Sequence, residues 1–296
     1  MDNILVSIVL PTFEQSTLLH KAVESVLLQT HKNFELIVID DNHKVAYIEQ
    51  NKSYFLKLND KRVKYFQNSK NIGARESRNK GILYSEGEYI TFLDDDDIYL
   101  QDKIKNQING MITSGAFYSV CNFSLINESG KIIDLRTRRY LKNNESLLIK
   151  HLKYHITGTS TMMFESNFLK SIGCFSIDTL FGDLGDEFFL MLKAIKNSSK
   201  IGHIDSVDVI AKVHSITGLS NFKNMITKEK KLFRFKYSLK DNLSNKDLKY
   251  IKMRHFLVSS YAYKKGGDLI KFLAYCVIAF ILHPNGFIKI IIGKDR

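Results

Sequence analysis

The chain has 296 residues, of which 44% are hydrophobic and 11% aromatic. A chain of this length and composition can bury a sizeable core, which excludes a mainly disordered protein. Its formal net charge of +12 points to an anionic partner, whether a nucleic acid, a phospholipid or a phosphorylated substrate. Residues 221–296 contain 17 basic and 5 acidic residues, so this segment carries the whole excess and the first 220 residues are formally neutral.

Cysteine usage and the first residues indicate the compartment. The three cysteines, Cys121, Cys174 and Cys276, are odd in number and widely spaced, which argues against a disulfide framework and against a cluster of zinc ligands. The first apolar run, residues 4–10, is too short and wrongly flanked for a signal peptide. We therefore expect a protein of the reducing cytoplasm.

The first hundred residues alternate short β-rich runs with helical patterns, which is typical of a parallel sheet covered by crossover helices. The expected strands are residues 6–10, which end at Pro11, and residues 34–39, 63–66 and 89–93. The expected helices are residues 18–27, 48–58 and 74–84. No Gly-x-Gly-x-x-Gly follows the first strand and no P-loop motif is present, which argues against a Rossmann dehydrogenase and a P-loop nucleotidase.

The second half of the chain is less regular. Two strands, residues 116–126 and 131–135, are predicted around a turn, and a third is predicted at residues 160–164. A helix is predicted at residues 186–196, and helical periodicity continues through the lysine-rich residues 222–264.

Two apolar runs, residues 272–282 and 287–292, end the chain and are separated by His283-Pro284-Asn285-Gly286. A membrane-spanning helix needs about 20 uninterrupted apolar residues, and this stretch is broken near its middle. Three alternatives remain open for it: an interfacial or hairpin-like membrane contact, a buried terminal helix, and a membrane span.

Acidic residues follow two of the expected strands. Residues 94–97 are four consecutive aspartates, whose mutual repulsion a divalent cation such as Mg²⁺ or Mn²⁺ would offset. Asp40 and Asp41 follow the strand at 34–39, where a carboxylate can accept hydrogen bonds from a base or ribose. The alternatives are a solvated acidic turn and an Asx turn. Because ligands of parallel sheets bind outside the carboxyl ends of the strands, both clusters are expected to face one crevice.

Several motifs of the first half occur in the order and spacing of a known family. They are residues 6–13, 25–30, 34–41, 71–73, 77–79 and 87–97. Together they resemble the family 2 glycosyltransferases over residues 4 to about 105. The resemblance implies the GT-A fold, which is an α/β fold with a mixed, mainly parallel sheet flanked by helices. It also implies sugar transfer from a nucleotide donor with inversion, assisted by Mn²⁺ or Mg²⁺.

The resemblance assigns roles around the donor. It implies that Asp41 hydrogen-bonds the base, with Asp40 as a neighbour, that Asp95 meets the ribose, and that Asp96, in the DxD motif, binds the metal. Asp94 and Asp97 are expected to orient them. The side chains expected on the nucleotide side are Pro11, Thr12 and Phe13, which line the base pocket, with Arg75 and Arg78.

The second half also carries landmarks of the family. Residues 157–164 resemble the segment that borders the acceptor, and residues 172–175 resemble its Gly-x-Phe. The match makes Asp186 the catalytic base, although Glu187 remains an alternative because the family more often has Glu-Asp here. Acidic residues also favour a helix N-terminus without any catalytic role. His214 is expected to touch a phosphate or the metal, or else to be structural.

The expected organisation is a glycosyltransferase domain of residues 1–220 and a basic helical extension of residues 221–296. Residues 1–112 form the nucleotide-binding half of the domain and residues 113–220 the acceptor half. The expected acceptor is a glycan in cell-surface polysaccharide synthesis, for example one carried on polyprenyl diphosphate. The extension would hold the enzyme at the anionic inner face of the plasma membrane. Rival functions are a catalytically silent nucleotide-sugar-binding domain and a nucleic-acid-binding protein, although no nucleic-acid-binding motif is found.

Overall fold

The computed structural model describes residues 3–14, 17–176, 185–213 and 222–293. The chain divides into two compact units, each built from segments that are distant in the sequence. Unit 1 comprises Met1–Arg138, Thr157–Ser176 and Phe189–Val213. Unit 2 comprises Arg139–Ile156, Ile177–Phe188 and His214–Arg296. Unit 2 therefore joins part of the predicted 1–220 domain to the predicted extension.

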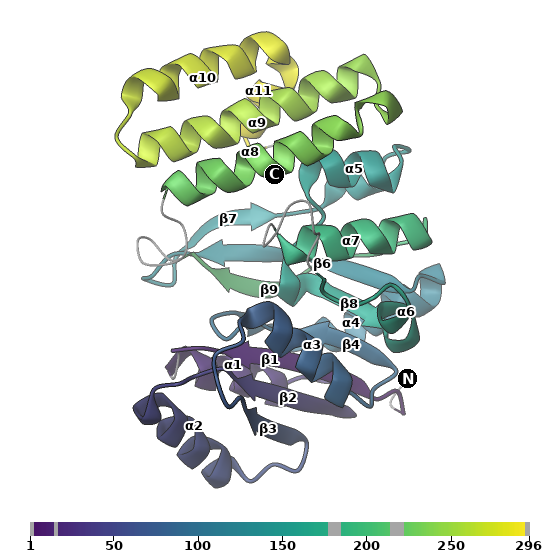
Figure 1. Ribbon diagram of the computed structural model, residues 1–296. Helices are drawn as coiled ribbons and strands as arrows, with labels where there is room; N and C mark the ends of the chain where they lie inside the picture. Colours follow the sequence, from purple (N-terminus) through teal and green to yellow (C-terminus); the bar gives the residue numbers. More distant parts are fainter. Residues whose placement is uncertain (1–2, 15–16, 177–184, 214–221, 294–296) are drawn as a thin grey trace. The chain divides into compact units, whose positions relative to one another are not determined.

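Unit 1 is built on a mixed sheet that has nine strands among the described residues. Its strands are β1 Val6–Thr12, β2 Phe34–Asp40, β3 Val63–Gln67, β4 Tyr89–Phe92, β5 Ile98–Tyr99, β6 Tyr118–Ile126, β7 Ile132–Arg136, β8 Met162–Glu165 and β9 Gly202–Lys212. Their order is β3-β2-β1-β4-β8-β6-β9-β5, with β7 paired to β6 (Figure 1). The neighbours β3, β2, β1 and β4 are all parallel, which confirms the sheet predicted for the first hundred residues.

Pro11 does not end the first strand, as the sequence suggested, because β1 continues to Thr12. Pro11 pairs with Ile39 of β2 in the parallel register, whereas the pairing of β1 with β4 ends at Val9. Backbone groups of alternate residues point to opposite neighbours in a strand, so the proline nitrogen faces the side where no ladder bond is needed. The strand therefore extends into the loop region that forms the functional site.

Helices cover the sheet and close the core of unit 1 (Figure 1). They are α1 Thr17–Leu27, α2 Val45–Leu58, α3 Ala74–Tyr84, α4 Lys103–Ser114, α6 Ser166–Ser171 and most of α7 Asp186–Asn197. β1 and β2 are buried along their whole length, as expected for strands covered on both faces. α1 buries Leu19, Ala22, Val23 and Val26, which recur at helical spacing and pack against these strands.

Among the residues that the structure describes, unit 2 consists of helices and short connections. Its helices are α5 Leu147–Tyr154, α8 Phe222–Ser238, α9 Asn245–Lys265, α10 Leu269–Leu282 and α11 Pro284–Ile291, with the first residues of α7. α9 packs against α8, α10 and α5 (Figure 1). The lysine-rich stretch predicted to be helical is thus two helices, and Ser244 caps the second by accepting a hydrogen bond from the Asp247 amide.

The apolar end of the chain forms two helices that break at His283, as the sequence predicted. Within α10 only Ala279 is buried, whereas Ile270 is 83% and Ile281 70% exposed. The expectation of a buried terminal helix is therefore wrong for the described residues. None of the helices described in the structure combines the length and the apolar character needed to cross a bilayer.

Candidate functional site

A cavity of about 230 Å³ lies in unit 1, where β1, β2 and β4 end. It is lined by Pro11, Thr12, Phe13, Asp41, Ala74, Arg78, Asp94, Asp95 and Asp96. The fold thus brings together every predicted nucleotide-side residue except Arg75. Asp94 and Asp96 of the predicted acidic run line the same cavity. Arg75 does not line this cavity, and its Nε lies 3.0 Å from the Glu76 carboxylate.

Asp41 holds the loop that begins α3. Its Oδ1 accepts hydrogen bonds from the Ile72 amide at 2.9 Å and from Asn68 Nδ2 at 2.8 Å, and its Oδ2 accepts one from the Gly73 amide at 2.7 Å. Gly73 has φ +84°, a left-handed conformation that favours glycine. Asp41 therefore shapes one wall of the cavity, and an ionised carboxylate with about four acceptor sites retains one for a ligand.

Asp40, next to it, is a structural residue. It is fully buried, and its carboxylate accepts hydrogen bonds from Asn42, from Asn51 Nδ2 at 2.8 Å and from the Tyr65 hydroxyl at 2.6 Å. Hydrogen bonds to both of its oxygens tie the end of β2 to α2 and β3, and Asp40 does not line the cavity.

Asp95 supports the opposite wall. Its Oδ2 accepts hydrogen bonds from the Thr12 hydroxyl at 2.7 Å and from the Phe13 amide at 3.1 Å, so it fixes the end of β1. Burial raises the pKa of Asp95 to about 7, with Asp94 and Asp96 adding to the rise and the two hydrogen bonds opposing it. Burial and the repulsion between neighbouring carboxylates of this wall therefore together outweigh the nearby hydrogen-bond donors.

Arg78 is the cation of the cavity wall. Its Nη2 donates to Asp94 Oδ1 at 2.6 Å, and its guanidinium lies 5.6 Å from the centre of the Phe175 ring. Phe175 belongs to the segment that resembles the family's Gly-x-Phe, and its backbone is held by Asn79 of α3. The 172–175 landmark thus positions Arg78 rather than contacting the cavity itself.

Ser160 joins the predicted acceptor segment to the acidic run. Its hydroxyl donates to Asp97 Oδ2 at 2.6 Å and accepts from the Asp94 amide at 3.1 Å. Burial raises the pKa of Asp97 well above its usual range, and Asp94 and Asp96 add to the effect. Asp97 is buried and also accepts from the Lys212 amide at the end of β9, whereas Asp96 lines the cavity.

Asn68 is a site residue that sequence reasoning missed. It is 3% exposed, donates to Asp41 and accepts from Lys80 Nζ at 2.7 Å. It follows β3 directly, as the acidic residues follow β2 and β4. A polar residue at the end of a parallel strand was the signal that could have found it.

The divalent cation implied by the resemblance fits the chemistry of this wall. Three carboxylates, those of residues 94–96, line the cavity beside one cation, Arg78. Mg²⁺ and Mn²⁺ prefer oxygen ligands and commonly take one or two carboxylates, completing the shell with waters and phosphates. Within the described ranges no group of three His, Cys, Asp or Glu side chains is arranged to hold a metal ion. His214, the other predicted ligand, lies outside the described residues.

Asp186, the predicted base, is half-buried in the first turn of α7 and belongs to unit 2, as does Glu187. The ring of Phe188, in the same turn, is stacked 4.2 Å from His151 and lies edge-on to His155 and Phe235. The Lys236 ammonium lies 5.8 Å from the centre of the Phe188 ring. Phe188 therefore fixes the start of α7 within unit 2.

His151 also holds this turn through its backbone. Its Nδ1 accepts from the Ile156 amide at 3.1 Å, so its Nε2 carries the proton and donates to the Phe188 carbonyl at 3.0 Å. Burial lowers the pKa of His151 to about 3, and the Lys236 charge contributes to the shift. His151 is therefore a neutral structural donor and not a proton carrier at neutral pH.

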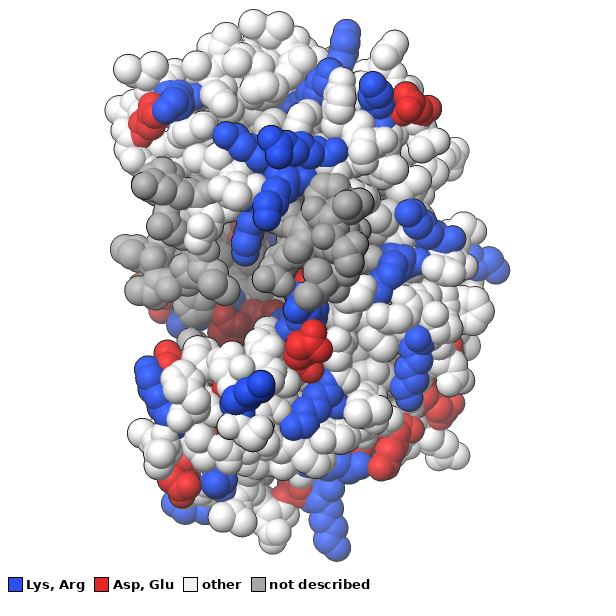
Figure 2. All heavy atoms as spheres, viewed as in Figure 1, with Lys and Arg blue, Asp and Glu red and all other residues white. Residues whose placement is uncertain are grey.

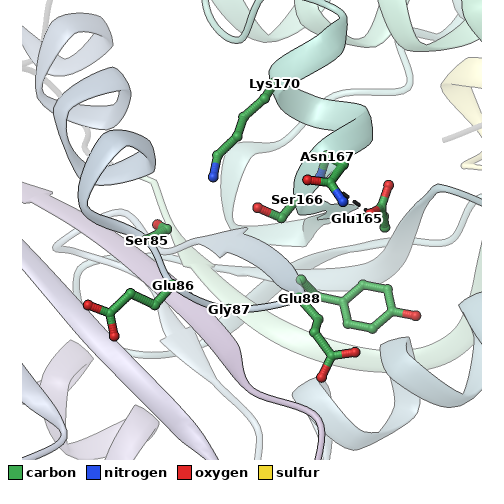
Figure 3. Close-up of a pocket in the computed structure, with 9 residues that line it drawn as sticks. Ser85, Glu86, Gly87, Glu88, Glu165, Ser166, Asn167 and Lys170 are labelled. Carbon is green, nitrogen blue, oxygen red and sulfur yellow. Dashed lines mark hydrogen bonds between the residues drawn. The ribbon is translucent and has the colours of Figure 1, made fainter.

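A second cavity of unit 1, about 400 Å³ in volume, lies at the other end of β4 (Figure 3). It is lined by residues 85–89 and by Glu165, Ser166, Asn167 and Lys170. Glu165 caps α6 by accepting hydrogen bonds from two backbone amides, and Glu86 pairs with Lys64. Because this cavity is at the amino end of β4, it is away from the strand ends where ligands of such sheets bind.

Comparison with known proteins agrees with the site. The family model described as Glycosyl transferase family 2 matches residues 7–172. An uncharacterized glycosyltransferase of Rickettsia felis is 41% identical over 129 residues, which are 44% of this chain and 21% of that protein. The chain therefore spans only about a fifth of the length of this relative.

Two other proteins match over more of the chain. WfaP of Escherichia coli, named UDP-Glc:alpha-D-GlcNAc-diphosphoundecaprenol beta-1,3-glucosyltransferase, is 30% identical over 223 residues, 75% of this chain and 83% of its own. The mannosyltransferase PcManGT of Pyrobaculum calidifontis, solved with GDP-Man and Mn²⁺, has a TM-score of 0.61 and 14% identity, over 96% of this chain and 80% of its own. With a family model that spans more than half of its residues and a GT-A sheet that ends in the acidic cavity, the chain belongs to glycosyl transferase family 2.

Proposed function

We propose that the chain is an inverting glycosyltransferase that moves a sugar from a nucleoside-diphosphate sugar to a hydroxyl of a lipid-linked glycan. The pathway would be synthesis of a cell-surface polysaccharide such as a capsule or an O-antigen. The observation that carries the proposal is the cavity in which Asp41 and residues 94–96 line one space at the ends of parallel strands. A hydrolase acting on sugars needs two carboxylates but no such nucleotide pocket.

The donor nucleotide would occupy this cavity. Pro11, Thr12 and Phe13 would form the surface under the base, and the 40% exposed ring of Phe13 is available for contact. Asp41 would accept a hydrogen bond from the base and Asp95 one from the ribose, since each carboxylate has acceptor capacity beyond its present bonds. Arg78 would meet phosphate oxygens, with Arg75 as a weaker candidate at the margin.

Asp96 would hold Mn²⁺ or Mg²⁺, with His214 as a second candidate ligand. When bound, such a cation neutralises the charge that develops on a departing nucleoside diphosphate. Asp96 lines the cavity beside Asp94 and Asp95, which supports a cation and a ribose bound on this wall. A relative of the same fold was solved with GDP-Man and Mn²⁺, which supports this choice of metal.

Asp186 would act as the general base that takes the proton of the acceptor hydroxyl during attack on the anomeric carbon. Its turn is fixed by Phe188 and His151, which supports a positioned rather than a mobile carboxylate. Glu187 is the alternative base, because it shares the same first turn. A base held in place also contributes to catalysis by orienting the two substrates.

The acceptor would be carried on a lipid at the inner face of the plasma membrane. WfaP is named for a diphosphoundecaprenol acceptor, and the whole excess of basic residues lies in residues 221–296. Basic side chains beside an apolar face favour an anionic leaflet. On the face shown in Figure 2, the C-terminal helices present many basic and few acidic side chains. We therefore place the protein at the membrane as a peripheral enzyme.

Thermal unfolding with nucleotide sugars tests the donor site. A bound donor raises the unfolding temperature, because a ligand that binds only the folded state stabilises it. We expect UDP- or GDP-sugars with Mn²⁺ to raise it for the wild type and not for Asp96→Asn. Asp241→Asn, which changes an exposed carboxylate in unit 2, is the matched control and should respond like the wild type. A panel in which no nucleotide changes the unfolding temperature would sink the donor assignment.

Transfer assays test the base. Asp186→Asn should keep the donor-induced thermal shift and lose about 10²- to 10⁴-fold in the transfer rate, the usual contribution of a general base. If Glu187→Gln loses this rate and Asp186→Asn does not, the base is Glu187. If the wild type and both variants bind donor and transfer sugar at equal rates, neither carboxylate is the general base. Donor binding with no transfer to any acceptor by the wild type would favour the silent nucleotide-sugar-binding domain.

A further inference from the structure

Unit 2 contains a cavity of about 500 Å³ that shares no residue with the donor cavity. It is lined from four places: the loop before α5, the end of α5, the start of α9 and the start of α11. The lining residues are Asn143, Glu145, Lys153, Tyr154, Lys246, Asp247, Tyr250, His283, Asn285, Gly286, Ile288 and Lys289. Neither the sequence motifs nor the comparisons assign it a role.

Close packing builds the floor of this unit 2 cavity. Tyr250 lies edge-on to Tyr154 at 5.5 Å and to His283 at 5.3 Å. A Cβ at Gly286 would lie 2.7 Å from His283 Nδ1 and 2.8 Å from the Tyr250 ring, so only glycine lets α11 approach this closely. His283 Nδ1 accepts from the Gly286 amide at 3.0 Å, which leaves its Nε2–H to donate.

Among the described residues, the charged side chains that line the cavity fall into two groups, those with ion pairs and those without. Lys153, whose side chain is 8% exposed, contacts the carboxylates of both Glu145 and Asp247. Burial lowers the pKa of Lys153, but the hydrogen bonds that its ammonium donates to Asp247 and Glu145 raise it more, so the net shift of this pKa is upward and Lys153 stays ionised. Lys246 and Lys289 are exposed and have no ion pair in the part of the chain that the structure describes.

One buried acceptor in the lining also lacks a partner. Glu145 Oε2 is buried and has no hydrogen-bond partner among the described residues, although its Oε1 contacts Lys153. A buried carboxylate oxygen without a donor costs free energy that a hydroxyl group would recover. The cavity thus offers cations for a phosphate and an acceptor for a hydroxyl, which together fit a sugar phosphate.

An apolar face adjoins the cavity. Ile288 lines the cavity and is 46% exposed, and Ile291 and Ile292, one turn further along, are 56% and 57% exposed. α10, which packs against α11, carries further exposed apolar residues: Leu269, Ile270, Leu273, Val277, Ile278, Phe280 and Ile281. An apolar face of this extent beside unpaired lysines matches a lipid with an anionic head group, not a water-soluble sugar phosphate.

α5 connects this cavity to the candidate base within unit 2. His151 of α5 donates to the Phe188 carbonyl, two residues after Asp186, while Lys153 and Tyr154 of the same helix line the cavity. A head group in this cavity would therefore lie beside the helix that fixes the turn of the base.

We propose that the unit 2 cavity binds the glycosyl-phosphate head group of a membrane lipid, with Lys246 and Lys289 on the phosphate and Glu145 on a sugar hydroxyl. The lipid chain lies along the exposed apolar face of α10 and α11. The proposal rests on the proposed function in one respect, that this lipid is the acceptor.

Vesicle binding by the full chain tests the cavity without requiring transfer. The probes are phosphatidylcholine vesicles alone, the same vesicles with undecaprenyl diphosphate, and the same vesicles with N-acetylglucosaminyl-diphospho-undecaprenol. We expect both phosphate-bearing lipids to increase co-sedimentation. Lys246→Gln with Lys289→Gln should weaken this binding about tenfold or more, at roughly fivefold for each lysine near a charged surface. Glu145→Gln should weaken binding of the sugar-bearing lipid more than binding of undecaprenyl diphosphate.

The matched control is Lys228→Gln with Lys249→Gln, which removes the same charge from exposed positions of unit 2 outside the cavity. Equal weakening by both double variants would mean general attraction to the anionic surface and would overturn the cavity assignment. No gain over phosphatidylcholine alone would overturn it too. Inorganic pyrophosphate is the probe for the free anion: a thermal shift that depends on Lys246 and Lys289, without vesicle binding, would assign the cavity to a soluble phosphate and overturn the lipid.

The two proposals can fail separately. If the wild type binds the phosphate-bearing vesicles but transfers no sugar, the cavity assignment stands and the proposed transferase activity is wrong. Transfer to a lipid-linked acceptor with the same KM for the acceptor in the wild type and in the Lys246→Gln, Lys289→Gln variant supports the transferase and overturns the cavity assignment.

Discussion

Asp41 shows how one carboxylate can shape the donor cavity before any donor binds. It accepts hydrogen bonds from the amides of Ile72 and Gly73 and from Asn68. In Asp41→Asn, the new NH₂ group faces one of these donors, so one buried donor loses its partner. We expect the free energy of unfolding to fall by about 1–3 kcal/mol and the KM for the donor to rise about tenfold, measured by thermal unfolding and by transfer kinetics.

Asp60→Asn is the control for this prediction. Asp60 also accepts from a backbone amide, that of Arg62, and from the Arg62 guanidinium, but it lies outside the donor cavity. It should lose some stability and keep the KM for the donor. If Asp41→Asn and Asp60→Asn have the same donor KM, Asp41 is a structural residue only.

The residues of the donor cavity could be predicted because most of them follow strands directly. The acidic residues 40–41 and 94–97 are found from a short apolar run and the polar residues after it, whereas Pro11 is assigned by the resemblance to the family. Asn68 follows β3 in the same way, yet its contact with Asp41 depends on β3 lying beside β2 with Gln67 opposite Asp40. Strand neighbours are set by tertiary packing, so this contact could not be derived from the local pattern.

The first turn of α7 is an element whose position depends on α5. His151→Leu removes the donor to the Phe188 carbonyl and the acceptor for the Ile156 amide. We expect it to lower kcat at least tenfold with little change in the KM for the donor, because the donor cavity is in unit 1 and Asp186 in unit 2. Transfer kinetics with saturating acceptor measure both constants.

His151→Gln is the conservative variant, since its amide can both donate and accept, and it should recover most of kcat. The pH dependence of unfolding adds a second readout. Because burial lowers the pKa of His151 to about 3 in the folded state, the unfolded state binds the proton first, and stability is lost as the pH falls below about 6.5. The Gln variant should lose less stability between pH 6.5 and 4 than the wild type. An unchanged pH profile would contradict a buried neutral His151.

One element that the sequence failed to predict, β9, has an interrupted pattern. β9 pairs with β6, but the register shifts twice: Cys121 pairs with Ile204, Asn122 with Val207 and Phe123 with Val209. This bulge breaks the alternation of apolar and polar residues that identifies a strand. Asn122 Nδ2 bonds the Asp205 carbonyl at 2.7 Å and stabilises the bulge, a contact that only the folded sheet provides.

At the scale of the whole molecule, the basic segment of the sequence and the second compact unit have different boundaries. The excess positive charge lies in residues 221–296, as the composition shows, but unit 2 also takes residues 139–156 from the earlier chain. The partners of those residues are in α8 and α9: Lys236 contacts His155, and Asp247 contacts Lys153. The C-terminal helices and residues 139–156 thus belong to one compact unit.

A truncated chain tests this organisation. In a protein of residues 1–213, Lys153 loses Asp247, Tyr154 loses Tyr250 and His155 loses Lys236. Loss of one partner of a buried ion pair alone costs about 3–5 kcal/mol, and the apolar surface under α8 and α9 becomes exposed as well. We therefore expect the truncated chain to unfold at a lower temperature, with a broader transition and increased binding of a hydrophobic dye.

A chain of residues 1–266, which keeps α8 and α9 and lacks α10 and α11, is the comparison. It retains the contacts of Lys153 and Tyr154 and should unfold cooperatively, with a smaller loss of stability. It loses the exposed apolar face and should no longer bind vesicles. If the 1–213 chain instead unfolds as cooperatively and at the same temperature as the full chain, then residues 139–156 fold without the C-terminal helices, and a boundary near residue 220 is correct.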